Sequence, residues 1–521
     1  MKNKVIIDNI RIPVSADDAD ILSVAEKRLK SAGIAYDKET LHIHKKSVDA
    51  RRRNDISFVC SAIADTDVLE SKSENIRIKC TPDYQLDKKA VQLKSRPVII
   101  GFGPAGIFSA MALAEAGLCP IVFERGACVS ERISAIDKFY STKVLNVENN
   151  IQFGAGGAGT FSDGKLTTRI GDHRCSYVLE KLHKLGAPDD ILWKAKPHIG
   201  TDILRSVVDN ADKYITSLGG EIRYNTKVIS VGDNYVETAD GRFESDCIVV
   251  ATGHSARDIY SMLFKKGFML EAKPFSVGVR AEHLQVDIDT ALYGDPSLYK
   301  KIGHGEYQMS YRQGDRGVYT FCMCPGGEVM AATSEEGGVV TNGMSRYARD
   351  GKNANAAVAV SVLPSDFGCD PIKAIEFQRK LERAAFIKGG SNYSAPCQLM
   401  GDFFAGKKGK IDGPVKPSYM NGDVVSVDFS DILPGFVSEM LKIGFRKFGK
   451  TIKGYDSNNI PLTGVETRTS APVRIIRQED FTAPGHKNIY PCGEGAGYAG
   501  GIMSAAVDGL RVAEAIMNRY S

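Results

Sequence analysis

The chain has 521 residues, of which 43% are hydrophobic and 25% charged, a composition that excludes a wholly disordered or collagen-like protein. Lys and Arg number 67 against 63 Asp and Glu, and the net charge of +4 is too close to zero to indicate nucleic acid as the main partner. At roughly 100–200 residues per domain, the length predicts two to four domains.

The cysteines and the apolar stretches predict a reduced, cytoplasmic protein. The 11 cysteines are scattered and contain no C-x-x-C pair, which disfavours a zinc ribbon and a thioredoxin-type redox pair. Residues 1–8 lack the apolar core of a secretory signal, and no stretch approaches the ~18 apolar residues of a membrane span. No His, Cys and carboxylate set has metal-ligand spacing, so we expect no bound metal.

Residues 1–92 are predicted to form a small α/β accessory module. Alternating or apolar stretches indicate strands there, and apolar residues at helical spacing indicate one helix. In chain order the elements are a strand at 4–12, a helix at 17–31, and strands at 41–45 and 56–63.

A basic run at 45–53 lies inside this module. Such a run is usually a solvated surface, and the alternative is an electrostatic docking patch for a partner or for RNA. The polar residues 81–96 follow the module and contain Pro82, so we expect a linker there.

The next segment has the pattern of a phosphate-binding β-α-β unit. Short apolar strands at 96–100 and 120–124 flank a glycine-rich turn at 101–106 and an Ala-rich helix at 107–116. Strands that are apolar throughout are expected in a parallel sheet that is covered on both faces.

The turn fits the G-x-G-x-x-G pattern, and its glycines have separate physical roles. Gly101 permits the tight turn, Gly103 lets a pyrophosphate approach the backbone, and Gly106 lets helix and strand pack closely. Glu124 ends the second strand 23 positions after Gly101, where a carboxylate can accept hydrogen bonds from an adenosine ribose. The same charge would repel a 2′-phosphate and so argues against NADP here. A glycine-rich turn that binds nothing is the alternative.

The C-terminal segment distinguishes FAD from NAD. A predicted strand at 488–492 is followed by Gly493 and Glu494, and a carboxylate in that position can bind a ribityl hydroxyl, which FAD has and NAD lacks. Gly500 and Gly501 then begin a helix whose N–H groups can stabilise negative charge on a reduced flavin. We therefore predict FAD as the cofactor.

On these motifs the chain resembles the two-dinucleotide-binding-domain flavoproteins, which include the glutathione-reductase and p-hydroxybenzoate-hydroxylase groups. More narrowly, it is similar to a group of bacterial, mostly uncharacterised FAD-dependent dehydrogenases of the NAD(P)/FAD-dependent oxidoreductase family. The resemblance implies a fold and a cofactor, but no substrate. It is carried by 98–125, 246–253 and 488–509 for the wider group, and by 156–166, 251–255, 321–327 and 342–345 for the narrower one.

The expected fold class is α/β, with a Rossmann-like FAD-binding domain built on a parallel sheet, a mixed α+β substrate domain, and the small N-terminal α/β module. The domain boundaries we predict are 1–92 for the module, 96–274 with 455–521 for the FAD-binding domain, and 275–454 for the substrate domain. Further elements are predicted as helices at 211–218, 371–386 and 504–518, strands at 221–231 and 246–251, and a hairpin at 235–244.

The motifs and the resemblance together predict which residues contact FAD. By resemblance, the turn 251–253 lies beside the cofactor and Val228 lies where a strand passes the adenine. The full predicted set is Gly101, Gly103, Pro104, Ala105, Gly106, Glu124, Arg125, Arg132, Thr160, Val228, Ala251, Thr252, Gly253, Gly493, Glu494, Gly501 and Ile502.

The sequence names no catalytic residue, because the difficult chemistry of a flavoenzyme belongs to the flavin ring. Cys322 and Cys324 would share one face of a strand and are a candidate redox pair, whereas buried small hydrophobes are the alternative. The other candidates, each with a structural alternative, are His254 as an acid–base group, Thr160, Ser162 and Lys165 as flavin-lining side chains, and Arg468 and Arg474 as anion-binding groups.

We predict an FAD-dependent oxidoreductase that moves electrons or hydride between a donor and an unknown small-molecule substrate. No second G-x-G-x-x-G follows residue 165, so NAD(P)H, if it is the donor, would dock transiently beside the flavin. The alternatives are an FAD-containing, RNA-associated protein that docks tRNA through 45–53, and a non-catalytic FAD-binding protein.

Overall fold

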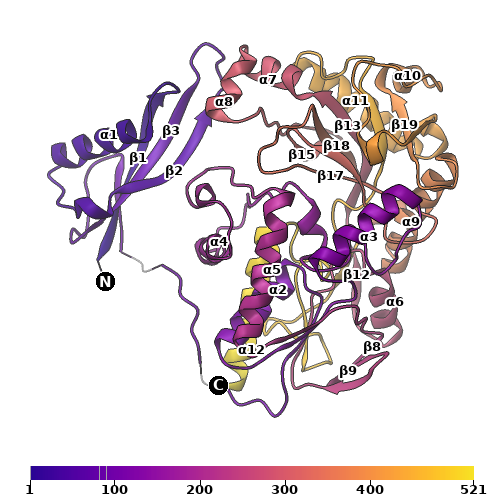
Figure 1. Ribbon diagram of the computed structural model, residues 1–521, viewed down its shortest axis with the longest axis horizontal. Helices are drawn as coiled ribbons and strands as arrows, with labels where there is room; N and C mark the ends of the chain where they lie inside the picture. Colours follow the sequence, from indigo (N-terminus) through magenta and orange to yellow (C-terminus); the bar gives the residue numbers. More distant parts are fainter. Residues whose placement is uncertain (1, 81–82, 90) are drawn as a thin grey trace.

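In the computed structural model, which describes residues 2–80, 83–89 and 91–521, the N-terminal module lies at one side of the main body (Figure 1). It contacts the main body through backbone hydrogen bonds of Lys46 with Trp193 and Ala195. Four antiparallel strands form its sheet in the order β2-β3-β1-β4, and α1 packs on one face through Ile21, Ala25 and Leu29. The elements are β1 (Asn3–Pro13), α1 (Asp18–Ser31), β2 (His42–Asp49), β3 (Ser57–Thr66) and β4 (Ile76–Lys79).

The predicted helix of the module and its first strands are confirmed. Asp17 and Asp20 form a capping box that starts α1, which satisfies backbone N–H groups that a helix end leaves unpaired. β4 was not expected from the sequence. β2 continues to Asp49, so the basic run begins on a strand and ends in the turn after it.

The predicted β-α-β unit is confirmed as β5 (Val98–Ile100), α2 (Pro104–Glu115) and β6 (Ile121–Phe123). These strands belong to a five-stranded parallel sheet in the order β23-β11-β5-β6-β7. One face packs on helices α2, α5 and α12, and the other on α6 and the small antiparallel sheet β10-β9-β8. Burial on both faces explains why every residue of β5 is apolar.

Two of the remaining elements of this part of the chain differ from the predicted limits. The predicted strand 221–231 is two strands in different sheets, because the chain turns at Asn225, where φ is +53°. The helix predicted from Ala211 begins at Thr201. The elements are α3 (Val129–Thr142), α4 (Arg174–Lys184), α5 (Thr201–Ser217), β7 (Glu221–Arg223), β8 (Ser230–Gly232), β9 (Tyr235–Thr238), β10 (Gly241–Glu244), β11 (Ile248–Val250), α6 (Arg257–Lys265), β12 (Leu270–Ala272), β22 (Val473–Ile475), β23 (Ile489–Pro491) and α12 (Ile502–Tyr520).

The second large unit, here called the cap, is built on a seven-stranded mixed sheet in the order β14-β15-β18-β13-β21-β19-β20. β21 lies beyond the predicted limit at residue 454, but it pairs with β13 and β19, so the sheet continues past that limit. Its elements are β13 (Phe275–Leu284), α7 (Gln285–Tyr293), α8 (Tyr299–Ile302), β14 (Ser310–Gln313), β15 (Arg316–Cys324), β16 (Glu328–Ala331), β17 (Thr341–Met344), β18 (Asn353–Val362), α9 (Pro371–Lys388), β19 (Ala395–Leu399), α10 (Met400–Ala405), β20 (Val424–Ser426), α11 (Gly435–Thr451) and β21 (Pro461–Glu466).

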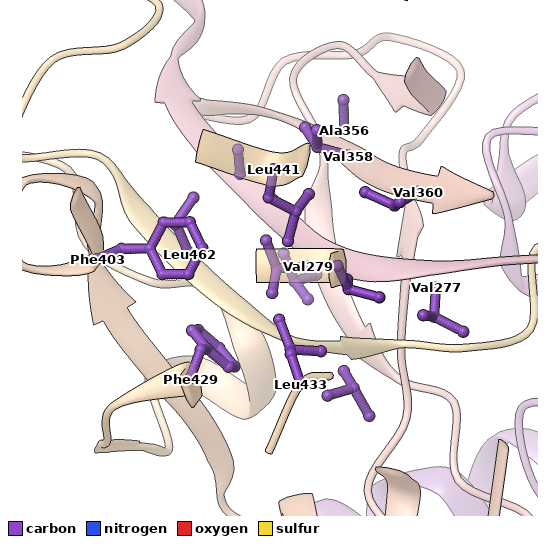
Figure 2. Close-up of a cluster of buried hydrophobic side chains, with 14 of the residues drawn as sticks. Val277, Val279, Ala356, Val358, Val360, Phe403, Phe429, Leu433, Leu441 and Leu462 are labelled. Carbon is purple, nitrogen blue, oxygen red and sulfur yellow. The ribbon is translucent and has the colours of Figure 1, made fainter. Parts of the chain in front are cut away.

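The core of the cap lies between this sheet and α11, where branched apolar side chains interdigitate (Figure 2). Leu441 of α11 and Leu462 of β21 are both fully buried. We expect Leu441→Ala to lower the free energy of unfolding by about 2–5 kcal/mol, because a buried Leu leaves both lost burial and a cavity. Urea denaturation would measure this, with Ile387→Ala as the control, since Ile387 is 57% exposed. An equal effect of the two changes would contradict the assignment of Leu441 to the core.

None of the helices within the described ranges is both long enough and apolar enough to cross a membrane. In the same part of the chain, no group of three or more His, Cys, Asp and Glu side chains is arranged to hold a metal ion.

Candidate functional site

A cavity of about 1360 Å³ lies between the parallel sheet and the cap. It exceeds the ~300–1,000 Å³ of most small-molecule sites, so it can hold a large ligand. Ile100, Phe123 and Ala251, at or just after the carboxyl ends of β5, β6 and β11, line its floor. This is the edge at which parallel α/β sheets bind their ligands.

The three glycines of the turn differ in what surrounds them. A Cβ at Gly101 would lie 2.5 Å from the Ala251 carbonyl oxygen, and one at Gly106 would lie 2.0 Å from the Gly101 oxygen. Neither glycine has room for a side chain, and the absence of side chains there allows β5, β11 and α2 to lie close together. A Cβ at Gly103 would meet nothing nearer than Gly157 Cα at 3.9 Å. Gly103 lines the cavity and leaves space in front of the N-terminus of α2, where an anionic group is favoured.

Glu124 lines the cavity but is already bonded to the protein. Its carboxylate accepts hydrogen bonds from the backbone N–H groups of Phe102 (2.8 Å), Gly126 (3.0 Å) and Gly154 (2.9 Å). A carboxylate has about four acceptor positions, so roughly one stays available for a ribose hydroxyl. Glu124 therefore ties three turns together, and its contact with a ribose stays a prediction.

The structure places thirteen of the seventeen predicted residues on the cavity wall and four behind it. Those on the wall are Gly101, Gly103, Pro104, Ala105, Glu124, Arg125, Val228, Ala251, Thr252, Gly253, Glu494, Gly501 and Ile502; those behind it are Gly106, Arg132, Thr160 and Gly493.

Two of those behind the wall are bonded to a neighbouring loop, and their contact with the cofactor stays a prediction. The Arg132 guanidinium is fully buried and donates to the carbonyl oxygens of Asn150, Ile151, Gly154 and Ala155. The Thr160 hydroxyl donates to the Ala155 oxygen at 3.0 Å. Both side chains hold the 150–155 loop through these bonds, and neither lines the cavity.

The C-terminal segment meets the glycine-rich turn at the cavity. β23 pairs with β11, which pairs with β5. Helices α2 and α12 pack closely, because a Cβ at Gly509 would lie 2.2 Å from the Ala105 oxygen. Asp508 accepts from the Gly493 N–H at 2.7 Å and from Arg477 at 2.7 and 2.9 Å, which fixes the bend after β23.

His254 and Glu494 form a polar pair on the cavity wall. His254 Nδ1 lies 3.2 Å from Glu494 Oε1, and the His254 side chain is 10% exposed. Its Nε2 is buried and has no hydrogen-bond partner among the described residues. Such an orphaned buried atom is costly unless a ligand satisfies it. The open space at Gly103 and this unsatisfied nitrogen both fit an elongated ligand that has a diphosphate and hydroxyl groups.

The cap and the loop 157–165 supply the other end of the cavity. Lys165 and Cys322 line it, together with Glu306 and Arg349. Arg349 pairs with Asp163 (2.6 Å) and with Glu306 (2.5 Å), so its charge is balanced. Lys165 Nζ donates to the Met323 carbonyl oxygen, next to Cys322. Ser162 also lies on this wall, and its contact with the flavin stays a prediction.

We expect Cys322 to be unusually reactive toward alkylation. A hydrogen bond from Cys324 and the positive charges of Arg280 and Lys165 lower its pKa to about 6, against the opposing effects of burial and of Glu466. The thiolate is the nucleophile, and an ordinary Cys has a pKa near ~8.5. To measure this, flavin-free protein is alkylated with iodoacetamide at several pH values, and the labelled peptides are quantified by mass spectrometry. The rate of alkylation of Cys322 should therefore reach half its maximum near pH 6. A half-maximal rate near pH 8.5, or labelling at pH 6 that persists in Cys322→Ser, would contradict this.

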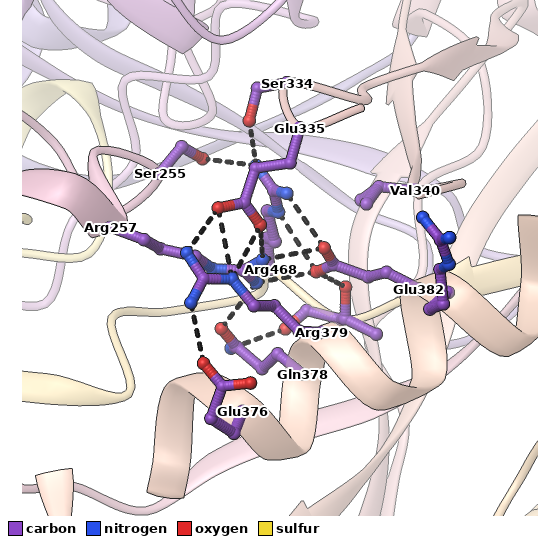
Figure 3. A network of polar contacts seen from close by, with 12 residues as sticks. Ser255, Arg257, Ser334, Glu335, Val340, Glu376, Gln378, Arg379, Glu382 and Arg468 are labelled. Carbon is purple, nitrogen blue, oxygen red and sulfur yellow. Dashed lines mark hydrogen bonds and ion pairs between the residues drawn. The ribbon is translucent and has the colours of Figure 1, made fainter. Parts of the chain in front are cut away.

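A buried ionic network joins the parallel-sheet domain to the cap (Figure 3). Arg257 of α6 and Arg468 both bind Glu382 of α9, at 2.7 and 2.9 Å. Burial alone would raise the pKa of Glu382, but the two guanidinium charges outweigh it and hold that pKa far below its usual range. Arg468 lines the cavity, whereas Arg474 does not and lies 3.8 Å from Glu271. Arg468 thus forms the structural ion pair, and its binding of an anion in the cavity stays a prediction.

The basic run of the N-terminal module is largely paired within the protein. Arg51 binds Asp49 at 2.7 Å, and Arg53 donates to the Ala291 carbonyl oxygen. Lys46, just before them, binds Asp18 at 2.7 Å. Docking of tRNA through 45–53 stays a prediction.

Comparisons with known proteins identify relatives of the chain. Residues 274–469 match the family described as "FAD-dependent protein, C-terminal domain-like". An uncharacterized protein of Clostridium beijerinckii is 44% identical, over 99% of this chain and 98% of its own length.

Among solved structures, 2-methyl-3-hydroxypyridine-5-carboxylic acid oxygenase is 11% identical, with 82% of this chain and 85% of that one covered and a TM-score of 0.34. CtdE in complex with FAD is 11% identical, with 82% and 88% covered and a TM-score of 0.32. The halogenase PltM in complex with FAD is 12% identical, with 82% and 70% covered and a TM-score of 0.36.

Proposed function

We propose that the chain is an FAD-dependent oxidoreductase. The premise is that it belongs to one family with the C. beijerinckii protein and carries the C-terminal domain of FAD-dependent proteins. The protein is a flavoprotein with FAD as its cofactor, and bound FAD supplies a carrier of two electrons. The reaction that we propose is the transfer of electrons or hydride between a donor and a small-molecule substrate.

The observation that carries this proposal is the meeting of two glycine-rich segments at one cavity. The turn 101–106 and the segment 493–502 come from opposite ends of the chain, and residues of both line the same wall. Each precedes a helix, so two helix N-termini face one space, where they would stabilise negative charge. A dinucleotide has such charge at its diphosphate, and a reduced flavin has it on its ring.

Different residues on the cavity wall would bind different parts of FAD. We assign the diphosphate to the N-terminus of α2 at Gly103, the ribityl chain to Glu494, and the flavin ring to the N-terminus of α12 at Gly501. His254, held by Glu494 through Nδ1, presents Nε2 as an acceptor for a cofactor hydroxyl. The cap closes the opposite side, where a substrate would meet the ring away from bulk water.

Anaerobic reduction tests this function. The protein, saturated with FAD, is mixed with NADH and with NADPH in separate experiments, and the visible absorbance band of the flavin is followed. Free FAD at the same concentration is the control. We expect one of the donors to bleach the bound flavin faster than the free one. If no nicotinamide donor and no organic reductant bleaches the bound flavin faster than the control, the protein is better described as a non-catalytic FAD-binding protein.

A further inference from the structure

Cys322 and Cys324 lie where strand β15 of the cap reaches the cavity. Cys322 lines the cavity, whereas Cys324 is fully buried. The pairing of β15 with β18 shifts register between Phe321 and Cys324, and Cys322 has a φ of +44°. A left-handed conformation is uncommon for a residue with a side chain, and bulges of this kind re-aim side chains beside active sites.

The bulge, rather than the regular strand that the sequence suggested, places the Cys324 thiol against the backbone of Cys322. Cys324 Sγ lies 3.3 Å from the carbonyl oxygen of Cys322. The side chain of Cys324 lowers the pKa of Cys322, and the side chain of Cys322 raises that of Cys324. Cys322 thus faces the cavity, and Cys324 is buried behind it.

Two cations hold this segment in place. Arg280 of β13 donates to the Cys322 carbonyl oxygen at 3.2 Å, while its charge is balanced by Glu466 at 3.0 Å. Lys165 donates to the Met323 carbonyl oxygen on the cavity side. Both cations favour a thiolate at Cys322, as basic neighbours do in reactive cysteines.

One short loop joins this segment to the phosphate-binding turn. At its start, a Cβ at Gly157 would lie 3.1 Å from Gly103 Cα. At its end, Lys165 contacts Met323. The loop and Cys322 line one continuous cavity with Gly103 and Gly501. A ligand that extends from Gly103 along this wall is therefore directed toward the Cys322 end.

We propose that Cys322 and Cys324 form a redox-active dithiol that exchanges two electrons with the flavin, an inference that rests on the proposed function. On oxidation, the Cys322 thiolate and the Cys324 thiol form one S–S bond, the S–H bond of Cys324 breaks, and the pair releases two electrons and one proton. Oxidised flavin, by its class an acceptor of two electrons and a proton, is the co-reactant. In the reverse direction the disulfide takes up the same electrons and proton.

Thiol mapping tests the dithiol without any turnover. The purified protein is equilibrated in buffers of graded reduced-to-oxidised dithiothreitol, free thiols are blocked with N-ethylmaleimide, and tryptic peptides are analysed by mass spectrometry. The peptide from Gly317 to Arg346 contains both cysteines and no other. We expect it to lose two hydrogen atoms and both labels as the buffer becomes oxidising. Cys324→Ser should abolish this change, and Cys369→Ser, a change at an exposed cysteine outside the pair, should not.

Counting electrons links the dithiol to the flavin. Protein saturated with FAD, in which thiol mapping has first shown the Cys322–Cys324 pair to be oxidised, is titrated anaerobically with dithionite. Because flavin and disulfide each accept two electrons, wild type and Cys369→Ser should take up about four per flavin, and Cys322→Ser and Cys324→Ser about two. The dithiol is refuted if no disulfide maps to this peptide, or if wild type and both serine variants take up equal numbers of electrons per flavin. Either result leaves the proposed reduction of the flavin unaffected. A protein that binds no FAD would refute the proposed function, and thiol mapping would then still decide whether the pair forms a disulfide.

Discussion

Gly103→Val is expected to give a folded protein that retains FAD less well than wild type. The backbone at Gly103 is extended (φ −85°, ψ −176°), a conformation that any residue adopts, and an added Cβ meets no protein atom closer than 3.9 Å. The side chain would instead occupy the space before α2 that we assign to the diphosphate. Inserting such a group into a packed contact costs about 1–3 kcal/mol, which is roughly a 5- to 150-fold weaker affinity.

Two measurements check this expectation. The flavin-to-protein absorbance ratio after purification reports retention, and titration of the flavin-free protein with FAD gives the change in Kd. Gly106→Val is the contrast, because its Cβ would lie 2.0 Å from the Gly101 carbonyl oxygen and so should lower thermal stability itself. If Gly103→Val purified with a full complement of flavin, the diphosphate would have to bind elsewhere.

The phosphate-binding unit could be predicted from the sequence because its information is local. Three glycines at fixed spacing, a preceding apolar strand and a following helix determine its backbone within a few residues. The same holds for α1, which begins at its own capping residues. The strand predicted at 221–231 failed for the opposite reason, since the turn at Asn225 is held by hydrogen bonds of Asn225 and Thr226 to Gly126 and Glu124, residues about a hundred positions away.

The functions of single side chains were harder to predict than the elements that carry them. Arg132 is near the motif in sequence, but its guanidinium is used by four carbonyl groups of a loop. Cys322 and Cys324 were expected to share a strand face by simple alternation. A bulge removes that alternation, and no short-range pattern indicates it. The approach of Lys165 to these cysteines depends on how the cap packs on the parallel sheet, and that of Arg280 depends on the strand order of the cap sheet.

The residues of the buried ionic network are also brought together only by packing. A substitution in this network has the second of the two largest expected effects. Arg257, Glu382 and Arg468 are far apart in the sequence, and each is at most 9% exposed. We expect Glu382→Gln to lower the free energy of unfolding by about 3–5 kcal/mol, because it keeps the shape of the side chain but leaves two arginines without their shared counter-charge. Urea denaturation at pH 7 measures this. Glu376→Gln on the same helix is the matched control, since its 57% exposed side chain forms a surface pair with Arg379, which is worth about 0–1 kcal/mol.

The pH dependence of this difference separates a lost charge from poorer packing. The folded-state pKa of Glu382 is depressed, so its contribution to stability is fully present above the unfolded value of 4.5 and declines as the pH falls toward the folded value. Glu382→Gln lacks this titration. The gap in unfolding free energy between wild type and Glu382→Gln should therefore be constant from pH 7 to about pH 5.5 and narrow as the pH falls below 4.5. A gap that stays the same at pH 3.5 to 4 would mean that shape, and not the charge of Glu382, joins the two domains.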